Sequence, residues 1–193
     1  MPPAPHGNRD DEKDCLRTDS SKAQFIAIRT LLSIAALCHL KLASVEISAA
    51  YLQAWELTRD KYMRPPKRWT KYIDEVWKLI KPAYGLVESG RLWQLCIEEW
   101  LSEYGFKQIA GFPQFLVLPS DGQISALFLV KFVDDILLAV ETREIEKFSK
   151  AISKRFEVSR ALIDRDLILN KLLIKQKPNF DIDVTMGDYI EEI

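Results

Sequence analysis

The stretch Ala126-Leu-Phe-Leu-Val-Lys-Phe-Val-Asp-Asp-Ile-Leu-Leu-Ala-Val140 organises the rest of this chain. Two runs of branched and aromatic apolar residues lie on either side of the adjacent acids Asp134 and Asp135, and no Gly or Pro interrupts them. The runs have the length and composition of buried β-strands, and Asp accepts the backbone of a tight turn. The stretch therefore predicts a buried β-hairpin that carries two carboxylates at its tip.

The negative charges of Asp134 and Asp135 must be neutralised by a cation or exposed to water. Carboxylates are costly to bury beside apolar surface unless a cation neutralises them, and two neighbouring acids raise that cost. Mg²⁺ and Mn²⁺ prefer hard oxygen ligands of this kind. On spacing alone, a solvated turn that joins two strands accounts for both acids as well.

The composition is that of a globular chain. Its 193 residues suit one domain, and 48% hydrophobic residues are enough for a core. A net charge of −1 neither demands nor excludes a nucleic-acid partner. The scattered cysteines and histidines argue against a zinc site or a disulfide framework. No stretch has the pattern of a signal peptide or a membrane span, so we expect an intracellular protein, cytoplasmic or nuclear and not secreted.

The beginning of the chain predicts a tail followed by a helix and a strand. Residues 1–20 are Pro-rich and then densely charged, which predicts a disordered tail before a domain over 21–193. A capping box at Ser21 and a helical apolar stripe that includes Phe25 predict a helix over 22–39.

The next stretch carries a third acid. A strand is predicted over 42–47, and Glu46 falls near its end, where it can meet an acid pair on a neighbouring strand. We expect Ser48 to cap the helical turn that follows. The later predicted elements are a helix that ends at Gly105, a strand over 114–119 with a turn at Asp121-Gly122, a helix over 143–156, a strand over 167–170 and terminal strands within 174–193.

Cations alternate with aromatic rings between Arg59 and Lys81. The cations can contact phosphates and the rings can stack on bases, as in nucleic-acid-binding tracks. A two-stranded flap with a solvated basic face accounts for the same composition. The candidate nucleic-acid-binding residues are Arg64, Lys67, Arg68, Lys81 and Arg91.

Several motifs, in the same order, resemble the reverse transcriptases of Ty1/copia-type retrotransposons. Phe132-Val-Asp-Asp135 resembles the aromatic-x-Asp-Asp box of that family. Glu46-Ile-Ser-Ala-Ala-Tyr-Leu52 resembles its first catalytic box, with Glu in place of the usual Asp. The stretch from Tyr84 to Trp93 resembles a long family motif in which Glu88 replaces a Gln. The resemblance spans about 20–193.

The resemblance implies an α+β fold, with a palm-like antiparallel sheet, packed helices and a partial fingers subdomain that includes an insert over about 53–82. It implies an RNA-directed DNA polymerase that transfers nucleotides to a primer 3′-hydroxyl, with RNA or DNA template–primer and deoxynucleoside triphosphates as partners. Glu46, Asp134 and Asp135 would be catalytic and would hold two Mg²⁺ or Mn²⁺ ions. Tyr51, Glu88 and Val133 would lie at the nucleotide, Tyr51 as the ring that excludes a 2′-hydroxyl.

Departures from the family pattern keep other functions open. Glu46 is one methylene longer than Asp, and Glu88 brings a negative charge toward a triphosphate. We therefore expect a truncated and partly degenerate domain. A catalytically dead remnant, or a recruited nucleic-acid-binding module with the same fold, is the main alternative. A metal-dependent phosphodiester hydrolase that shares the acids by coincidence is another.

Overall fold

The computed structural model describes residues 24–69, 75–120, 126–163, 167–169 and 172–186. The expected tail, the capping box at Ser21 and the turn at Asp121-Gly122 lie outside these residues. The chain divides into two compact units, each described here by itself. We call Ser21–Ser48 together with Leu101–Ile193 the sheet unit, and Ala49–Trp100 the ribbon unit.

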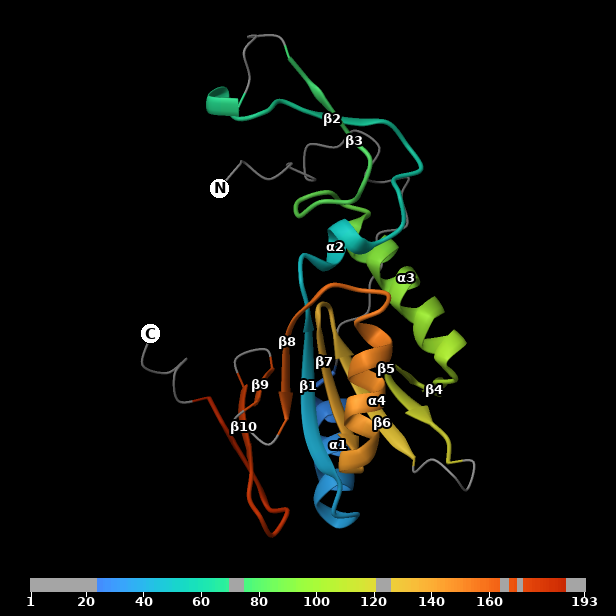
Figure 1. Ribbon diagram of the computed structural model, residues 1–193, viewed down its shortest axis with the longest axis vertical. Helices are drawn as coiled ribbons and strands as arrows, with labels where there is room; N and C mark the ends of the chain where they lie inside the picture. Colours follow the sequence, from blue (N-terminus) through green and yellow to red (C-terminus); the bar gives the residue numbers. More distant parts are fainter. Residues whose placement is uncertain (1–23, 70–74, 121–125, 164–166, 170–171, 187–193) are drawn as a thin grey trace. The chain divides into compact units, whose positions relative to one another are not determined.

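The sheet unit is built on a six-stranded sheet with the order β4-β5-β6-β7-β1-β8. All its paired strands are antiparallel, which confirms the expectation of a mixed fold with a large antiparallel sheet (Figure 1). The strands are β1 (Lys41–Ile47), β4 (Lys107–Ile109), β5 (Phe112–Leu118), β6 (Leu127–Phe132), β7 (Asp135–Val140) and β8 (Val158–Ile163).

The central strand β7 is buried on both faces. Successive side chains of a strand point to opposite faces, and Ile136 through Val140 are all at most 1% exposed. Leu137 and Ala139 belong to an apolar cluster with α1 (Phe25–Leu37). The alternate residues face the side that α4 (Thr142–Ile152) covers (Figure 1). Helices on both faces explain why the sequence of the hairpin is an almost continuous apolar run.

Helix α1 is shorter than predicted, and Phe25, at the beginning of its expected apolar stripe, is exposed. Ala27, Ile28, Leu31, Leu32 and Ala35 form its buried face. Phe25 is 55% exposed, so its assignment to the core stripe is wrong. The helix begins after Gln24, whose side chain makes no capping hydrogen bond.

Helix α4 also ends earlier than predicted, at Ile152 instead of Phe156. Its outer face is solvated, as expected for a basic amphipathic helix. Lys147 Nζ lies 2.9 Å from Glu144 Oε1, and Lys150 Nζ lies 3.6 Å from Glu146 Oε2. These cations are paired with acids of their own helix.

Gly105 ends helix α3 (Ser89–Tyr104), as predicted. Its φ of +108° is in the left-handed region that favours glycine. The Phe106 amide donates to the Leu101 carbonyl at 2.9 Å, which is the bond of a Schellman motif. A side chain at Gly105 would also approach Leu118 Cδ1 at 3.1 Å.

A second, three-stranded sheet has the order β11-β10-β9, with β9 (Leu167–Leu169), β10 (Leu172–Gln176) and β11 (Ile182–Thr185). The side-chain amide of Gln176 joins it to the beginning of β1. Gln176 Oε1 accepts the Leu42 amide at 3.1 Å, and its Nε2 donates to the Leu40 carbonyl at 2.8 Å. The Gln176 side chain thus makes the kind of backbone hydrogen bonds at the beginning of β1 that a neighbouring strand would make.

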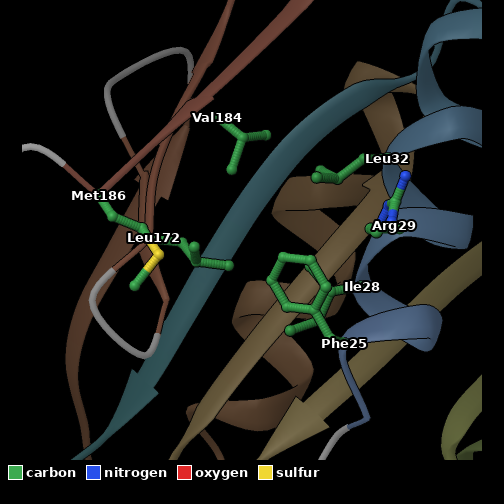
Figure 2. A pocket seen from close by; sticks show the side chains of 7 residues that line it. All are labelled: Phe25, Ile28, Arg29, Leu32, Leu172, Val184 and Met186. Carbon is green, nitrogen blue, oxygen red and sulfur yellow. The ribbon is translucent and has the colours of Figure 1, made fainter.

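An apolar pocket of about 280 Å³ lies beside α1 (Figure 2). Side chains of α1 and of the three-stranded sheet point into it from opposite sides. Its lining residues are Phe25, Ile28, Arg29, Leu32, Leu172, Val184 and Met186. Within the described ranges, no helix has the length and apolar character needed to cross a bilayer.

The ribbon unit contains a short helix, a β-ribbon and most of α3. Helix α2 spans Ala50–Gln53, and its N-cap is Ala49 at a φ of +43° with no side-chain cap bond. The expectation that Ser48 caps this turn is therefore wrong. Strands β2 (Lys61–Met63) and β3 (Trp77–Leu79) pair as an antiparallel ribbon, and the 3₁₀ turn η3 (Lys67–Trp69) lies between them in the chain.

Candidate active site

The central hairpin carries both acids at its tip, as the sequence predicts. Phe132 and Asp135 are paired across β6 and β7, so Val133 and Asp134 alone form the turn. Val133 has a φ of +53°, a value that β-branched residues rarely adopt. A positive φ at the first of two turn residues is typical of a type II′ hairpin turn, where Gly is usual. The turn is thus strained beside the two acids.

Strand β1 brings the third acid to the same end of the sheet. Glu46 is paired with Asp135 across the β1–β7 ladder, and directly opposite residues project from the same face. The Ile47 amide donates to the Asp134 carbonyl at 2.9 Å, which continues the contact to the turn. The β1–β8 register shifts between Glu46 and Ile47, and such bulges re-aim side chains beside functional sites.

The three acids affect one another electrostatically. Burial raises the pKa of Asp135, and the negative charges of Asp134 and Glu46 raise it further, from 3.8 to about 6. Like charges disfavour ionisation only when they are close to the titrating group. The end of the sheet therefore holds an excess of negative charge that a bound cation would relieve.

The donor chemistry of this cluster suits a hard divalent cation, because its side chains supply carboxylate oxygens. The positions of the side chains do not form a finished ligand set. Among the residues that the structure describes, no group of three or more His, Cys, Asp or Glu side chains is arranged to hold a metal ion. Convergence of the backbone is thus established, whereas shared coordination stays a prediction.

Tyr51, the expected sugar-excluding ring, lies in α2 of the ribbon unit. Its ring centroid is 4.5 Å from that of Tyr84, with an interplanar angle of 43°. Tyr84 is 49% exposed and lies just before Gly85, whose φ is +98°. The rings of Tyr51 and Tyr84 therefore pack against each other.

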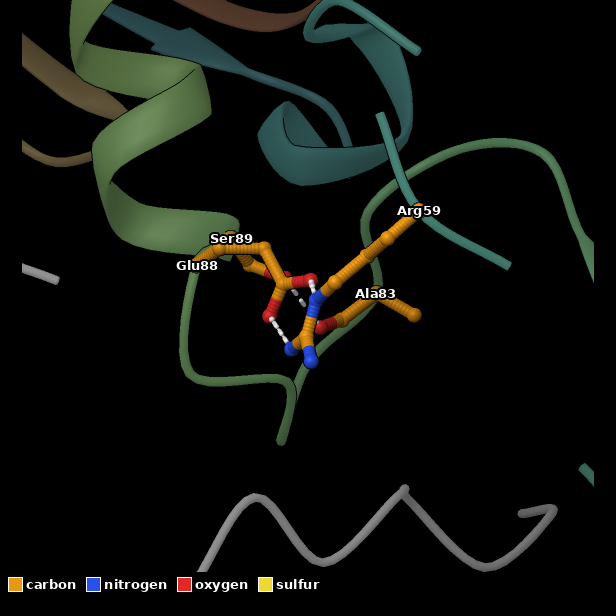
Figure 3. Close-up of polar contacts among 4 residues, drawn as sticks. All are labelled: Arg59, Ala83, Glu88 and Ser89. Atoms are coloured by element: carbon orange, nitrogen blue, oxygen red, sulfur yellow. Dashed lines mark hydrogen bonds and ion pairs between the residues drawn. The ribbon is translucent and has the colours of Figure 1, made fainter. Parts of the chain in front are cut away.

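Glu88 is not the unbalanced charge that the sequence led us to expect. Arg59 Nε donates to Glu88 Oε1 at 2.8 Å and Arg59 Nη2 donates to Glu88 Oε2 at 2.9 Å (Figure 3). The two side chains are only 16% and 10% exposed. A bidentate pair of this kind neutralises the carboxylate and fixes its orientation.

The candidate nucleic-acid-binding cations are spread over the ribbon unit. Arg64 is exposed, and the guanidinium of Arg68 lies 5.4 Å from the ring centroid of Trp69. Lys81 Nζ donates to the Ala54 carbonyl at 2.8 Å. Lys67 lies in η3 and Arg91 in the first turn of α3. The segment forms a two-stranded ribbon, as the alternative interpretation of its composition proposed, and its contact with nucleic acid stays a prediction.

Arg59 is the site residue that sequence reasoning missed. It was one cation among many in a basic segment, and its partner lies 29 residues further along the chain. No local spacing rule pairs residues so far apart. The sequence therefore contained no signal that would have paired Arg59 with Glu88.

The fold and the acid cluster define a class of α+β proteins in which an antiparallel sheet presents carboxylates at one end. Residues 8–193 match the family profile described as reverse transcriptase (RNA-dependent DNA polymerase). This chain belongs to that family. Its relatives identify the type as the reverse transcriptase domain of a copia-type retrotransposon, at low sequence identity.

Three relatives illustrate the extent of the similarity. The chain is 24% identical over 179 residues to the retrovirus-related Pol polyprotein from transposon TNT 1-94 of Nicotiana tabacum, covering 90% of this chain and 13% of the polyprotein. It is 31% identical over 120 residues to a putative transposon Ty5-1 protein of Saccharomyces cerevisiae, covering 61% and 37% respectively. It is 28% identical over 148 residues to the Pol polyprotein from transposon RE2 of Arabidopsis thaliana, covering 75% and 10%.

Proposed function

We propose that this chain is a template-directed DNA polymerase domain that adds deoxynucleotides to a primer 3′-hydroxyl. The single observation that supports the proposal most is the pairing of Glu46 with Asp135 beside the Asp134 turn. The family match supplies the substrate class, namely RNA or DNA template–primer and deoxynucleoside triphosphates. In this proposal the sheet unit is the palm, and residues 53–82 belong to the fingers.

The roles of the acids follow from their charge. Glu46, Asp134 and Asp135 would hold two divalent ions, Mg²⁺ or Mn²⁺. When bound, such ions supply Lewis acidity and stabilise the negative charge that develops at the transferred phosphate. The protein side chains position the reacting groups and contribute electrostatics, because phosphoryl transfer requires little covalent chemistry from the protein.

The nucleotide and template contacts are assigned to the ribbon unit and the hairpin turn. Tyr51 would exclude a 2′-hydroxyl, and Val133 and Glu88 would lie at the incoming nucleotide. Five cations of the ribbon unit would contact phosphates of the template–primer. These cations are Arg64, Lys67, Arg68, Lys81 and Arg91.

Primer extension on the purified chain tests the proposal. Extension of a DNA primer on RNA and DNA templates is measured with Mg²⁺ and with Mn²⁺, for the wild type and for Asp134→Asn. We expect extension by the wild type and a loss of at least about a hundredfold in the variant, since the substitution removes a negative charge that a neutral amide or water does not supply to a divalent cation. Unchanged extension by Asp134→Asn would show that these acids are not catalytic.

A nucleic-acid-binding module without turnover is the second candidate. The observation that favours it is the absence, within the described part of the chain, of acids arranged as a ready ligand set. This candidate predicts template–primer binding by gel shift, together with no Mn²⁺ binding at the acid cluster and no extension. Mn²⁺ binding detected by electron paramagnetic resonance, and lost in Asp134→Asn, would eliminate it.

A further inference from the structure

The Arg59–Glu88 pair differs from a second ion pair of the ribbon unit, that of Lys78 and Asp60. Lys78 Nζ contacts Asp60 Oδ1 at 2.6 Å, but these side chains are 54% and 62% exposed. Arg59 and Glu88 are at most 16% exposed and form two parallel hydrogen bonds. Exposed pairs contribute little, whereas removing one member of a buried pair leaves the other charge uncompensated. The consequences of breaking the two pairs should therefore differ.

Glu88 also belongs to a tightly bonded connection at the start of α3. Its carbonyl accepts the Leu92 amide at 3.0 Å, which places it at the helix N-terminus. The next residue, Ser89, donates from Oγ to the Ala83 carbonyl at 2.7 Å (Figure 3). This bond closes the connection that carries Tyr84, the ring against Tyr51. A shift of Glu88 would therefore disturb the backbone beside the candidate sugar-excluding ring.

We propose that Arg59 is a positioning residue of the candidate nucleotide site and that it acts through Glu88. Arg59 cancels the charge of a carboxylate that would otherwise repel a triphosphate, and it holds that carboxylate in one orientation. The pair is then neutral overall, as an uncharged side chain at this position would be. This inference rests on the proposed function, because it requires that a nucleoside triphosphate binds beside Glu88.

Four variants test this role through the affinity for dTTP. The affinity is measured on a template–primer whose 3′ end is a dideoxynucleotide. This primer has no 3′-hydroxyl, so dTTP can bind but cannot be incorporated. The variants are Arg59→Gln, Glu88→Gln, the double variant that carries both changes, and Arg59→Lys. Lys78→Gln is the matched control, because it removes a cation from an exposed pair of the same unit. Circular dichroism and urea unfolding establish that each variant is folded.

The two single variants are expected to change the affinity in opposite directions. Arg59→Gln leaves a buried anion and should weaken dTTP binding at least about tenfold. Glu88→Gln removes the anion and leaves the cation, so it should tighten binding about threefold. The double variant should return to within about threefold of the wild type. A bond with a purely structural role would instead weaken binding in both single variants.

Several results would overturn the role of Arg59. Wild-type affinity in Arg59→Gln, or a double variant as weak as Arg59→Gln, would overturn it while the proposed function stands. If the wild type binds no dTTP, the proposed function fails and the positioning role fails with it. If Arg59→Gln does not fold, Arg59→Lys and the double variant decide: both should bind dTTP within about threefold of the wild type, and weak binding by either would overturn the inference.

Discussion

Glu46 faces Asp135 across the β1–β7 ladder, at the residue where β7 leaves the hairpin turn. The two residues come from distant parts of the chain and carry the same charge. Their proximity is one of the causes that raise the pKa of Asp135 to about 6. An arrangement that costs folding free energy at neutral pH is more easily understood as a site for a cation than as a structural contact.

The raised pKa of Asp135 predicts how stability changes with pH. The group has a pKa of about 6 in the folded protein against 3.8 ordinarily, so between these values the folded state keeps a proton that the unfolded state has lost. Its contribution to stability is therefore present below about pH 4 and is lost as the pH rises through 6. Asp135→Asn should raise the free energy of unfolding at pH 7.5 by about 1–2 kcal/mol, allowing for partial solvent screening.

Urea unfolding at pH 4.5 and pH 7.5 measures this effect. Glu103→Gln, which removes an exposed carboxylate of the sheet unit, is the control and should stay within about 0.5 kcal/mol of the wild type. Mn²⁺ at pH 7.5 should stabilise the wild type and not Asp135→Asn, because a ligand stabilises only the state that binds it. Equal pH profiles for the wild type and Asp135→Asn would contradict the electrostatic account of the cluster.

Shortening the third acid should improve the site. Glu46→Asp restores the residue that the family's first catalytic box usually carries, and a carboxylate displaced by about 1 Å can change a rate on the order of a hundredfold. We expect higher Mn²⁺ affinity and faster primer extension in Glu46→Asp. Glu146→Asp, on the exposed face of α4, is the control. A decrease in both quantities would mean that the longer side chain suits its position.

Removal of the ring of Tyr51 should relax the choice of sugar. Tyr51→Val opens space where a 2′-hydroxyl would lie, and the preference for deoxyribonucleotides over ribonucleotides should fall on the order of tenfold or more. The ratio of kcat/KM values for dTTP and UTP is the measurement. Tyr51→Phe keeps the ring and should keep the preference. Equal discrimination by Tyr51→Val and the wild type would remove Tyr51 from the nucleotide site.

The backbone of Val133 predicts a stabilising substitution within the turn. A left-handed conformation costs an L-residue about 1–2 kcal/mol, and glycine adopts it at a smaller entropic cost. Val133→Gly should therefore raise the free energy of unfolding by about 0.5–1 kcal/mol. Val117→Gly, in the half-buried strand β5, should lower it. Loss of stability in Val133→Gly similar to that in Val117→Gly would show that the turn is not strained.

The sequence predicted the centre of the fold because its signals there are local. The hairpin from Ala126 to Val140 is marked by two apolar runs and a short polar break. Gly105 marks the end of α3 because only glycine readily takes its φ of +108°. The pairing of Glu46 with the acid pair could also be predicted. Glu46 lies near the end of a predicted strand, the acid pair lies at the tip of a predicted hairpin, and the family motifs occur in the same order.

Other features depend on tertiary contacts that local sequence patterns do not predict. Strand β8 (Val158–Ile163) was not predicted, because its pairing with β1 joins residues more than a hundred positions apart in the chain. Ser48 has the chemistry of a cap, but the chain turns at Ala49 in a left-handed conformation. Phe25 has helical spacing with the core residues and yet lines an open pocket. Tertiary structure overrides local preference in each case.

The acid-bearing strands β7 and β1 both lie inside their sheet, since β7 lies between β6 and β1 and β1 lies between β7 and β8. Amide protons from Ile136 to Ala139 should then exchange with deuterium only when the whole unit unfolds, whereas those of the isolated β2–β3 ribbon exchange through local opening. Substitutions accumulating at the outer strand β4 would leave the carboxylate spacing intact.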